Sequence, residues 1–515
     1  MIHAYTGSAV RAAEEPLLAA GQGPALMRRA AHGLAVEVGR LLRSAGRRVY
    51  GSRVAVLAGA GNNGGDALYA AAELAGRGAR VAAVLTSART HPEALAAFLA
   101  AGGRIFALDG ALGDSGPPPT AGGGTAGFLA EAAAADVLLD GILGTGGRGG
   151  VREPAASLLR SLAALPGPLV VAVDLPSGVD ADTGAAAGPV LAAELTVTFG
   201  AAKAGLLLSP GESHAGRVVE VDIGIAQRLG APLLRRLETA DLAALLPVPT
   251  RTSHKYSRGV LGIIAGSARY PGAAALCAGA AVSTGVGMVR YLGPAEVAAR
   301  VQQAHPEVVA AQGSVAESHV QAWLAGPGID GDRRQEDHAR AALAGPLPVV
   351  VDAGALPLVG TGHPASTILT PHAGELAVLL SRLDAPASRA EVEAAPHSCA
   401  TRAAALTGAT VLLKGATTVV AGPDGTVFSQ ADGTGWLATA GSGDVLAGML
   451  GALLAALADT PGPFTALGIP AAARWAGIAA LAASLHGRAA VAAGGPLQAS
   501  ALAAAIPAAW RAAGG

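Results

Sequence analysis

A glycine-rich turn carrying amide and carboxylate side chains lies early in the chain. Residues 54–72 read VAVLAGAGNNGGDALYAAA, a pattern typical of a strand, a turn and a helix. The turn has the G-x-G-x-x-G spacing and contains Asn62, Asn63, Gly64, Gly65 and Asp66. Backbone amides at a helix N-terminus bind phosphate, but a nicotinamide dehydrogenase also carries an acidic residue about 20 positions later. Because the next strand ends at Leu85 without one, the turn indicates phosphate binding and disfavours hydride transfer.

Two more predicted strands end in carboxylates. VLLDGILGTGGRGG contains Asp140 and then a loop of Gly144, Thr145, Gly146, Gly147, Arg148, Gly149 and Gly150. VVAVDLPSGVD contains Asp174 and Ser177. Ligands of open α/β sheets bind beyond the carboxyl ends of the strands. We therefore expect Asn63, Asp140 and Ser177 to offer oxygen ligands to a hard cation while the glycine loops hold phosphate. The alternative is that the two aspartates only cap turns.

The second half of the chain contains a sharper pattern, ATAGSGDVL at residues 438–446. The amides of Gly441–Gly443 would form an anion hole at a helix N-terminus, with Asp444 beside it as a base. This arrangement suits activation of a hydroxyl for phosphoryl transfer. The Walker pattern G-x-x-x-x-G-K-[ST] does not occur, so a P-loop fold is disfavoured. A purely structural helix cap is the alternative for Gly443 and Asp444.

Other strand-end segments fit the same pocket. A cation, amides and hydroxyls for a nucleotide could come from Lys414, Gly415, Ala416, Thr417 and Thr418. His372 lies in TPHAGE, where a structural role is the alternative to ligand contact. Gly328 follows a third strand, and Ala273 lies where a helix opens after the first strand of this half.

Alternating strands and helices must position these loops, which predicts an α/β fold with parallel sheets. In the first half we expect helices at 9–20 and 24–42 and strands at 53–58, 80–85, 136–140, 169–174, 195–199 and 217–222. In the second half we expect strands at 260–265, 349–352, 367–369, 410–413 and 418–421. Residues 110–127 are poor in large apolar side chains and predict a mobile surface loop. Lys203 is expected to be a solvated loop lysine, with phosphate contact as the alternative.

Bulk properties indicate more than one domain and exclude several classes of protein. A length of 515 residues is too long for one ordinary domain, and the polar segment 246–258 separates the two patterns. We therefore predict two domains, 1–237 and 238–515. The net charge of −1 gives no excess of positive charge that would indicate binding to nucleic acid or to an anionic membrane. The apolar runs look shorter than the roughly 20 residues of a spanning helix, and only two cysteines occur, so a cytoplasmic protein without disulfides is expected.

The first half resembles the NAD(P)H-hydrate epimerase family in its segments AGNNGGD, LLDGILGTG and VDLPSG. The resemblance implies a Rossmann-like three-layer sandwich that interconverts the R and S forms of hydrated NADH or NADPH. It implies that residues 62–66, 144–150 and Asp174 bind this substrate, and that Asn63, Asp140 and Ser177 bind K⁺. Asp174 is our candidate acid/base group, because a carboxylate near a cation and a polarised ring can move a proton.

The second half resembles the NAD(P)H-hydrate dehydratase family in TPHAGE, KGATT and GSGD. The resemblance implies a ribokinase-like fold, ADP as the phosphoryl donor and Mg²⁺ on its phosphates. Residues 414–418 and Gly443 would bind the nucleotide, and Ala273, Gly328, His372 and Asp444 the hydrated cofactor. Asp444 would deprotonate the added hydroxyl, whose phosphorylation allows elimination back to the nicotinamide.

Two other hypotheses stay open at this point. The C-terminal half could be a ribokinase-fold kinase of a vitamin-precursor alcohol, and the N-terminal half a non-catalytic binding or assembly module. A plain kinase has no use for a second dinucleotide crevice, which favours the paired repair activities. Small-molecule substrates and a homo-oligomer are expected.

Overall fold

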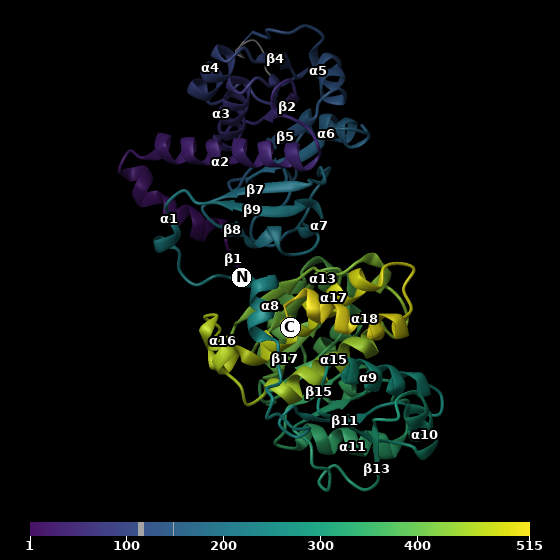
Figure 1. Cartoon of the computed structure of the whole chain (residues 1–515). Coiled ribbons are helices and arrows are strands. Elements are labelled where there is room, and N and C mark those ends of the chain that lie inside the picture. The colour runs from purple at the N-terminus through teal and green to yellow at the C-terminus, as the bar shows by residue number, and fades with distance from the viewer. Residues whose placement is uncertain (112–117, 148, 515) are drawn as a thin grey trace. The chain divides into compact units, whose positions relative to one another are not determined.

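The computed structural model describes residues 1–111, 118–147 and 149–514, and the chain forms two compact units. One unit comprises His3–Leu233, and the other comprises Leu234–Gly515 together with Met1–Ile2. Figure 1 shows helices and strands alternating along both. The two-domain α/β class expected from the sequence is therefore confirmed.

The N-terminal unit contains a seven-stranded sheet in the order β4-β3-β2-β5-β6-β7-β9. Every neighbouring pair in this sheet is parallel. Its strands are β2 (Arg53–Ala58), β3 (Arg80–Leu85), β4 (Arg104–Ala107), β5 (Val137–Gly141), β6 (Leu169–Val173), β7 (Leu195–Phe199) and β9 (Arg217–Val221). Outside the seven-stranded sheet, β1 (Ile2–Tyr5) pairs in parallel with β8 (Ala202–Lys203) through Ala4 and Tyr5.

Side chains of these strands alternate between two hydrophobic layers. Val54 and Val56 of β2 pack with helices α1 to α4, whereas Ala55 and Leu57 pack with α5 and α6. Period-two alternation with both faces apolar is what a sheet covered by helices on both sides requires. The helices are α1 (Gly7–Ala19), α2 (Gly23–Ser44), α3 (Asn62–Gly76), α4 (Pro92–Ala100), α5 (Gly124–Ala133), α6 (Ala155–Ala163) and the short α7 (Glu212–Ala215). This is a three-layer sandwich.

The C-terminal unit contains a mainly parallel sheet in the order β13-β12-β11-β14-β15-β16-β17-β18-β19-β10. Only the pairs β17–β18 and β18–β19 are antiparallel. The strands are β10 (Leu234–Arg236), β11 (Val260–Ile264), β12 (Met288–Leu292), β13 (Val309–Ala311), β14 (Ala322–Ala325), β15 (Val349–Val351), β16 (Thr367–Leu369), β17 (Thr410–Leu413), β18 (Thr418–Ala421) and β19 (Val427–Gln430).

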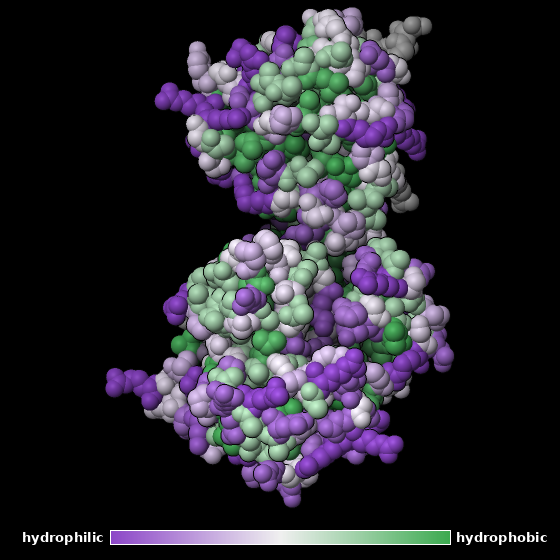
Figure 2. Space-filling model, turned by 90° about the vertical axis from the view of Figure 1, so that its right-hand side faces the viewer, coloured by the Kyte–Doolittle hydropathy of each residue, from purple (hydrophilic) through white to green (hydrophobic). Residues whose placement is uncertain are grey.

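Apolar, Ala-rich helices form the core of this unit against the sheet. The central ones are α9 (Pro271–Ser283), α15 (Ser442–Leu457), α17 (Arg474–Ala493) and α18 (Ala499–Ala512). The others are α8 (Thr239–Leu245), α10 (Ala295–Ala304), α11 (Arg333–Ala344), α12 (Ala373–Arg382), α13 (Arg389–Ala394), α14 (Pro396–Thr407) and α16 (Gly462–Ala466). On the faces visible in Figure 2, hydrophilic and hydrophobic residues are interspersed on both units.

Several expectations about elements need correction. One helical segment, Ala471–Ala493, is long and apolar enough to cross a membrane by length and composition, contrary to our expectation. Since 72% of its most apolar window is buried inside the unit, it has the character of a core helix. Residues 124–127, expected to be loop, begin α5, and residues 112–117 of that predicted loop lie outside the described residues.

Candidate active sites

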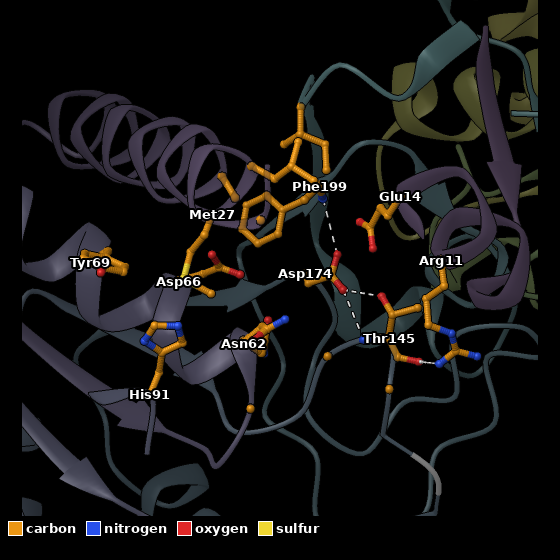
Figure 3. A pocket seen from close by; sticks show the side chains of 18 of the residues that line it. Arg11, Glu14, Met27, Asn62, Asp66, Tyr69, His91, Thr145, Asp174 and Phe199 are labelled. Carbon is orange, nitrogen blue, oxygen red and sulfur yellow. Dashed lines mark hydrogen bonds between the residues drawn. The ribbon is translucent and has the colours of Figure 1, made fainter. Parts of the chain in front are cut away.

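A cavity of about 760 Å³ lies at the carboxyl ends of the strands in the N-terminal unit. The glycine turn after β2, the loop after β5 and Asp174 after β6 all line it, as do α1 and α2 (Figure 3). The crevice predicted from three separate motifs is therefore one cavity, because β2, β5 and β6 are neighbours in the sheet. Its volume suits a small-molecule ligand.

The glycine turn needs its glycines because backbone segments approach one another closely there. A Cβ atom on Gly59 would lie 2.0 Å from the Ile142 carbonyl oxygen, and one on Gly64 would lie 2.3 Å from the Gly59 carbonyl oxygen. Helix α3 begins at Asn62, directly after Gly61, so its free N-terminal amides face the cavity end of β2. The predicted phosphate-binding turn is thus a bare helix N-terminus.

Asp174 is buried and lies in the left-handed backbone region, with φ of 67°. Its Oδ1 accepts hydrogen bonds from Thr198 Oγ1 at 3.1 Å, the Phe199 amide at 3.3 Å and the ammonium of Lys203. Its Oδ2 accepts from the Thr145 amide at 3.1 Å and from the Thr145 hydroxyl. Burial raises the pKa of Asp174, but Lys203 and Thr145 outweigh burial and hold that pKa below its ordinary value.

Lys203 is not the solvated loop lysine that we expected. Its side chain is buried and forms an ion pair with Asp174. The ammonium also donates to Thr198 Oγ1 at 3.0 Å and to the Phe199 carbonyl at 2.9 Å. Sequence position alone could not show this, since the short strand β8 that carries Lys203 is only two residues long.

The three predicted cation ligands lie around the loop after β5, which contacts Ser177 and Asn63. Ser177 Oγ donates to Asp140 Oδ1 at 2.6 Å, and Ser177 Oγ accepts from the Leu143 amide at 2.9 Å. A Cβ atom on the next residue, Gly144, would lie 3.0 Å from Asn63 Oδ1, so this glycine leaves room beside the amide. The donors are all oxygen atoms, which suits a hard cation such as K⁺. Among the described residues no group of three or more His, Cys, Asp or Glu side chains could hold a metal.

Two further carboxyl groups that line the cavity have raised pKa values. Asp66 is 7% exposed, and burial followed by the charges of Asp174 and Glu14 raises its pKa well above the ordinary value. Glu14 on α1 also lines the cavity, and burial raises its pKa as well. Glu14 was missed from the sequence because an amphipathic helix gives no sign of which acidic residue faces a ligand. Arg148, predicted to bind substrate, lies outside the described residues.

The second site lies at the start of α15 in the C-terminal unit. Gly441 precedes this helix in the left-handed region, with φ of 86°, which favours glycine. Asp444 follows in the first turn. His486 of α17 lies behind the turn, with its Nε2 2.9 Å from the Ser442 carbonyl oxygen, and its pKa is lowered to about 4 by burial. A neutral imidazole therefore anchors the glycine turn without adding charge.

A chain of charged side chains connects neighbouring strand ends to Asp444. Lys414, after β17, donates to Asp352 Oδ1 at 2.9 Å, and its Nζ lies 3.9 Å from Glu375 Oε2. Asp352, after β15, also accepts from Thr370 Oγ1 at 2.8 Å. Burial first, and then the charge of Asp352, raises the pKa of Asp444 to about 6, while Lys414 lowers it. Sequence reasoning assigned no role to Asp352, which is 2% exposed and holds Lys414 in place.

The remaining predicted residues fall around the same strand ends. A Cβ atom on Gly443 would lie 3.6 Å from Lys414 Nζ, so the glycine turn and the KGATT segment are close together. Ala273 and Gly328 are also close, since a Cβ atom on Gly328 would lie 2.8 Å from that of Ala273. His372 caps α12, where its Nδ1 accepts from the Glu375 amide at 3.2 Å, while most of its side chain stays exposed. Gly415 and Ala416 are exposed between β17 and β18, whereas Thr417 is buried.

Comparisons with known proteins match each half to a family. Residues 23–205 match the model of the YjeF-related protein N-terminus, and residues 261–504 match the NAD(P)H-hydrate dehydratase model. The bifunctional NAD(P)H-hydrate repair enzyme Nnr of Mycobacterium tuberculosis is 46% identical over 462 residues, covering 88% of this chain and 89% of that protein. The NAD(P)H-hydrate epimerase of Microbacterium testaceum is 44% identical over 247 residues, covering 47% of this chain and 85% of that protein.

A solved structure is also similar to the C-terminal half. It is the ADP/ATP-dependent NAD(P)H-hydrate dehydratase from Bacillus subtilis co-crystallized with ATP and Mg²⁺, at 27% identity and a TM-score of 0.45. The similarity covers 54% of this chain and 99% of that one.

Fold and sites together define a two-domain α/β enzyme with a glycine-turn crevice in each domain. More particularly, the chain belongs to the family of bifunctional NAD(P)H-hydrate repair enzymes, as its similarity to the mycobacterial relatives along most of both chains shows. Neither the lone-kinase hypothesis nor the non-catalytic N-terminal module is favoured by this match.

Proposed function

We propose that this chain restores hydrated NADH and NADPH in two steps. The N-terminal unit interconverts the R and S epimers, and the C-terminal unit dehydrates the S epimer with ADP as phosphoryl donor, releasing AMP and phosphate. The observation that carries the proposal is that both predicted motif sets converge, one on the cavity after β2, β5 and β6 and the other on Asp444 and Lys414.

In this proposal Asp444 acts as the base of the dehydratase. Its pKa of about 6 lies close enough to neutrality for the carboxylate to be ionised yet able to take a proton from a hydroxyl. Lys414 and the amides before α15 provide positive charge for a phosphoryl group in transfer. Phosphorylation converts the hydroxyl into a leaving group, and the ring nitrogen lone pair drives elimination.

The two metal ions belong to this proposal as well. Mg²⁺ is held largely by nucleotide phosphates in such sites and needs few protein ligands. K⁺ would be held by Asn63, Asp140 and Ser177, where it supplies positive charge near the substrate. The K⁺ site is supported by the hydrogen bonds of Ser177 to Asp140 and to the loop after β5, which bring oxygen ligands together.

Two variants separate the activities. Asp444→Ala should abolish ADP-dependent recovery of NADH from the S epimer, because it removes the carboxylate that takes the hydroxyl proton in this proposal, while epimerisation continues. Asp140→Asn should lose the K⁺-dependent epimerisation activity, while dehydration of the S epimer stays intact. Rates are measured by NADH absorbance and by chromatography of the two epimers. Near-normal recovery by Asp444→Ala would remove this residue from its role.

A further inference from the structure

Asp66 has a carboxyl group in the N-terminal cavity for which the described residues provide no hydrogen-bond or ion-pair partner. It lies in the first turn of α3 and lines the cavity, and its Oδ1 is buried without a hydrogen-bond partner among the described residues. In Figure 3 its carboxyl group points into the cavity, between Met27 and Asn62. An unpartnered buried polar atom is costly, so a native one calls for an explanation.

The surroundings of Asp66 favour its protonated form, because they raise its pKa. Burial raises its pKa, the carboxylates of Asp174 and Glu14 raise it further, and only Lys203 opposes them. The ammonium of Lys203 is already committed to Asp174, Thr198 and the Phe199 carbonyl. The charged or titratable side chains that line this cavity from other elements are Arg11, Glu14, Arg28, His91, Glu93, Asp174 and Lys203.

Asp174, in contrast to Asp66, has a lowered pKa and many hydrogen-bond partners. Both of its oxygens accept hydrogen bonds from Thr145, Thr198, Phe199 and Lys203, so protonating it would break established bonds. Two carboxyl groups in one cavity with their pKa values pushed apart are the usual arrangement of an acid and a fixed anion.

We infer that Asp66, and not Asp174, is the general acid of the epimerase, an assignment that rests on the proposed function. The Asp66 carboxylic acid donates its proton to the substrate hydroxyl as the carbon–oxygen bond breaks. The products are water, a ring iminium cation and the Asp66 carboxylate. Water then adds to the other face of the ring and returns one proton to Asp66, so the cycle closes without net consumption. Asp174 and Lys203 form a fixed ion pair that shapes the site.

The test compares Asp66→Asn with Glu73→Gln in the full chain. Asn has the shape of Asp but cannot donate an acidic proton, so epimerisation should slow by roughly 100-fold or more. Glu73 lies on the same helix but pairs with Arg77 and His32 outside the cavity, so its variant controls for loss of one charge. In the wild type, kcat/KM of epimerisation should fall as pH rises through the pKa of Asp66, and the residual rate of Asp66→Asn should not show this fall.

An infrared difference spectrum makes the test independent of activity. Wild type minus Asp66→Asn should show the C=O stretch of a protonated carboxylic acid at neutral pH. Absence of that band, or a wild-type rate and pH profile in Asp66→Asn, would overturn the inference. If the wild type shows no epimerisation while the band is present, the proposed function fails and the catalytic role of Asp66 fails with it.

Discussion

At the scale of residues, the two sites differ in how predictable they were. Glycines and carboxylates in ordered motifs, such as residues 62–66 and Gly441–Asp444, marked the strand-end loops correctly. The roles of Lys203 and Asp352 could not be assigned, because a buried charge is recognised only from the partner that the tertiary fold brings to it. Whether each predicted residue contacts ligand stays a prediction.

The Lys203–Asp174 pair should be strongly coupled. Lys203→Met leaves a buried carboxylate unpaired, and Asp174→Asn leaves a buried ammonium unpaired, so each should destabilise the N-terminal unit by about 3–5 kcal/mol. The double variant should lose clearly less than the sum of the two. Calorimetry measures the unit's unfolding. The control is the unfolding of the C-terminal unit followed by tryptophan fluorescence, which these variants should leave unchanged. All four tryptophans lie in that unit, namely Trp323, Trp436, Trp475 and Trp510. Simple additivity would contradict this ion pair.

Asp352 should tune the base of the dehydratase. Asp444 must be ionised to act, so dehydration should rise with pH through its pKa of about 6. Asp352→Asn removes a negative charge that raises this pKa, so the acidic limb of the pH profile should move to lower pH. Lys414 also loses its partner at 2.9 Å, so the KM for ADP should rise. An unshifted limb measured by steady-state kinetics would show that Asp352 has no influence on Asp444.

At the scale of elements, many strands inside the two sheets were predictable, and the edge strands β10 and β13 of the C-terminal unit were not. The predicted boundaries of β2, β3, β7, β16, β17 and β18 agree with the structure. β10 and β13 have three residues each and are only partly buried, so they lack the buried apolar pattern of the equally short β16. The close contact of α9 with α15 was also not predictable, although glycines permit it.

Gly448→Ala should damage that helix contact. A Cβ atom there would lie 2.2 Å from the Cys277 carbonyl oxygen of α9, so the two helices must move apart. We expect the C-terminal unit to lose about 1–3 kcal/mol, as in other overpacked cores. Because α9 carries Ala273 and α15 carries Asp444, dehydratase activity should fall too. Gly462→Ala, where a Cβ atom has nothing within 4 Å, is the control. Unchanged tryptophan-monitored unfolding of Gly448→Ala would contradict this packing.

At the scale of the whole molecule, the two units have separate cores and separate sites. Fusion of the two units has a chemical reason, because hydration of the cofactor yields both epimers. A dehydratase that takes only one epimer depends on an epimerase to convert the other. The sequence predicted two domains because its polar segment 246–258 interrupts two unlike α/β patterns. The sequence prediction was wrong about the length of the apolar segment at α17. An Ala-rich core helix of this length has the composition of a membrane span, and only its burial in the unit distinguishes the two.

The most direct test of the central claim is recovery of NADH from mixed R and S epimers. The purified chain is incubated with the mixture, ADP, Mg²⁺ and K⁺, and NADH absorbance is followed to its plateau. We predict recovery beyond the S fraction, because epimerisation continues to supply the dehydratase. A plateau at the S fraction would contradict an active epimerase, and no recovery with either ADP or ATP would contradict the dehydratase as well.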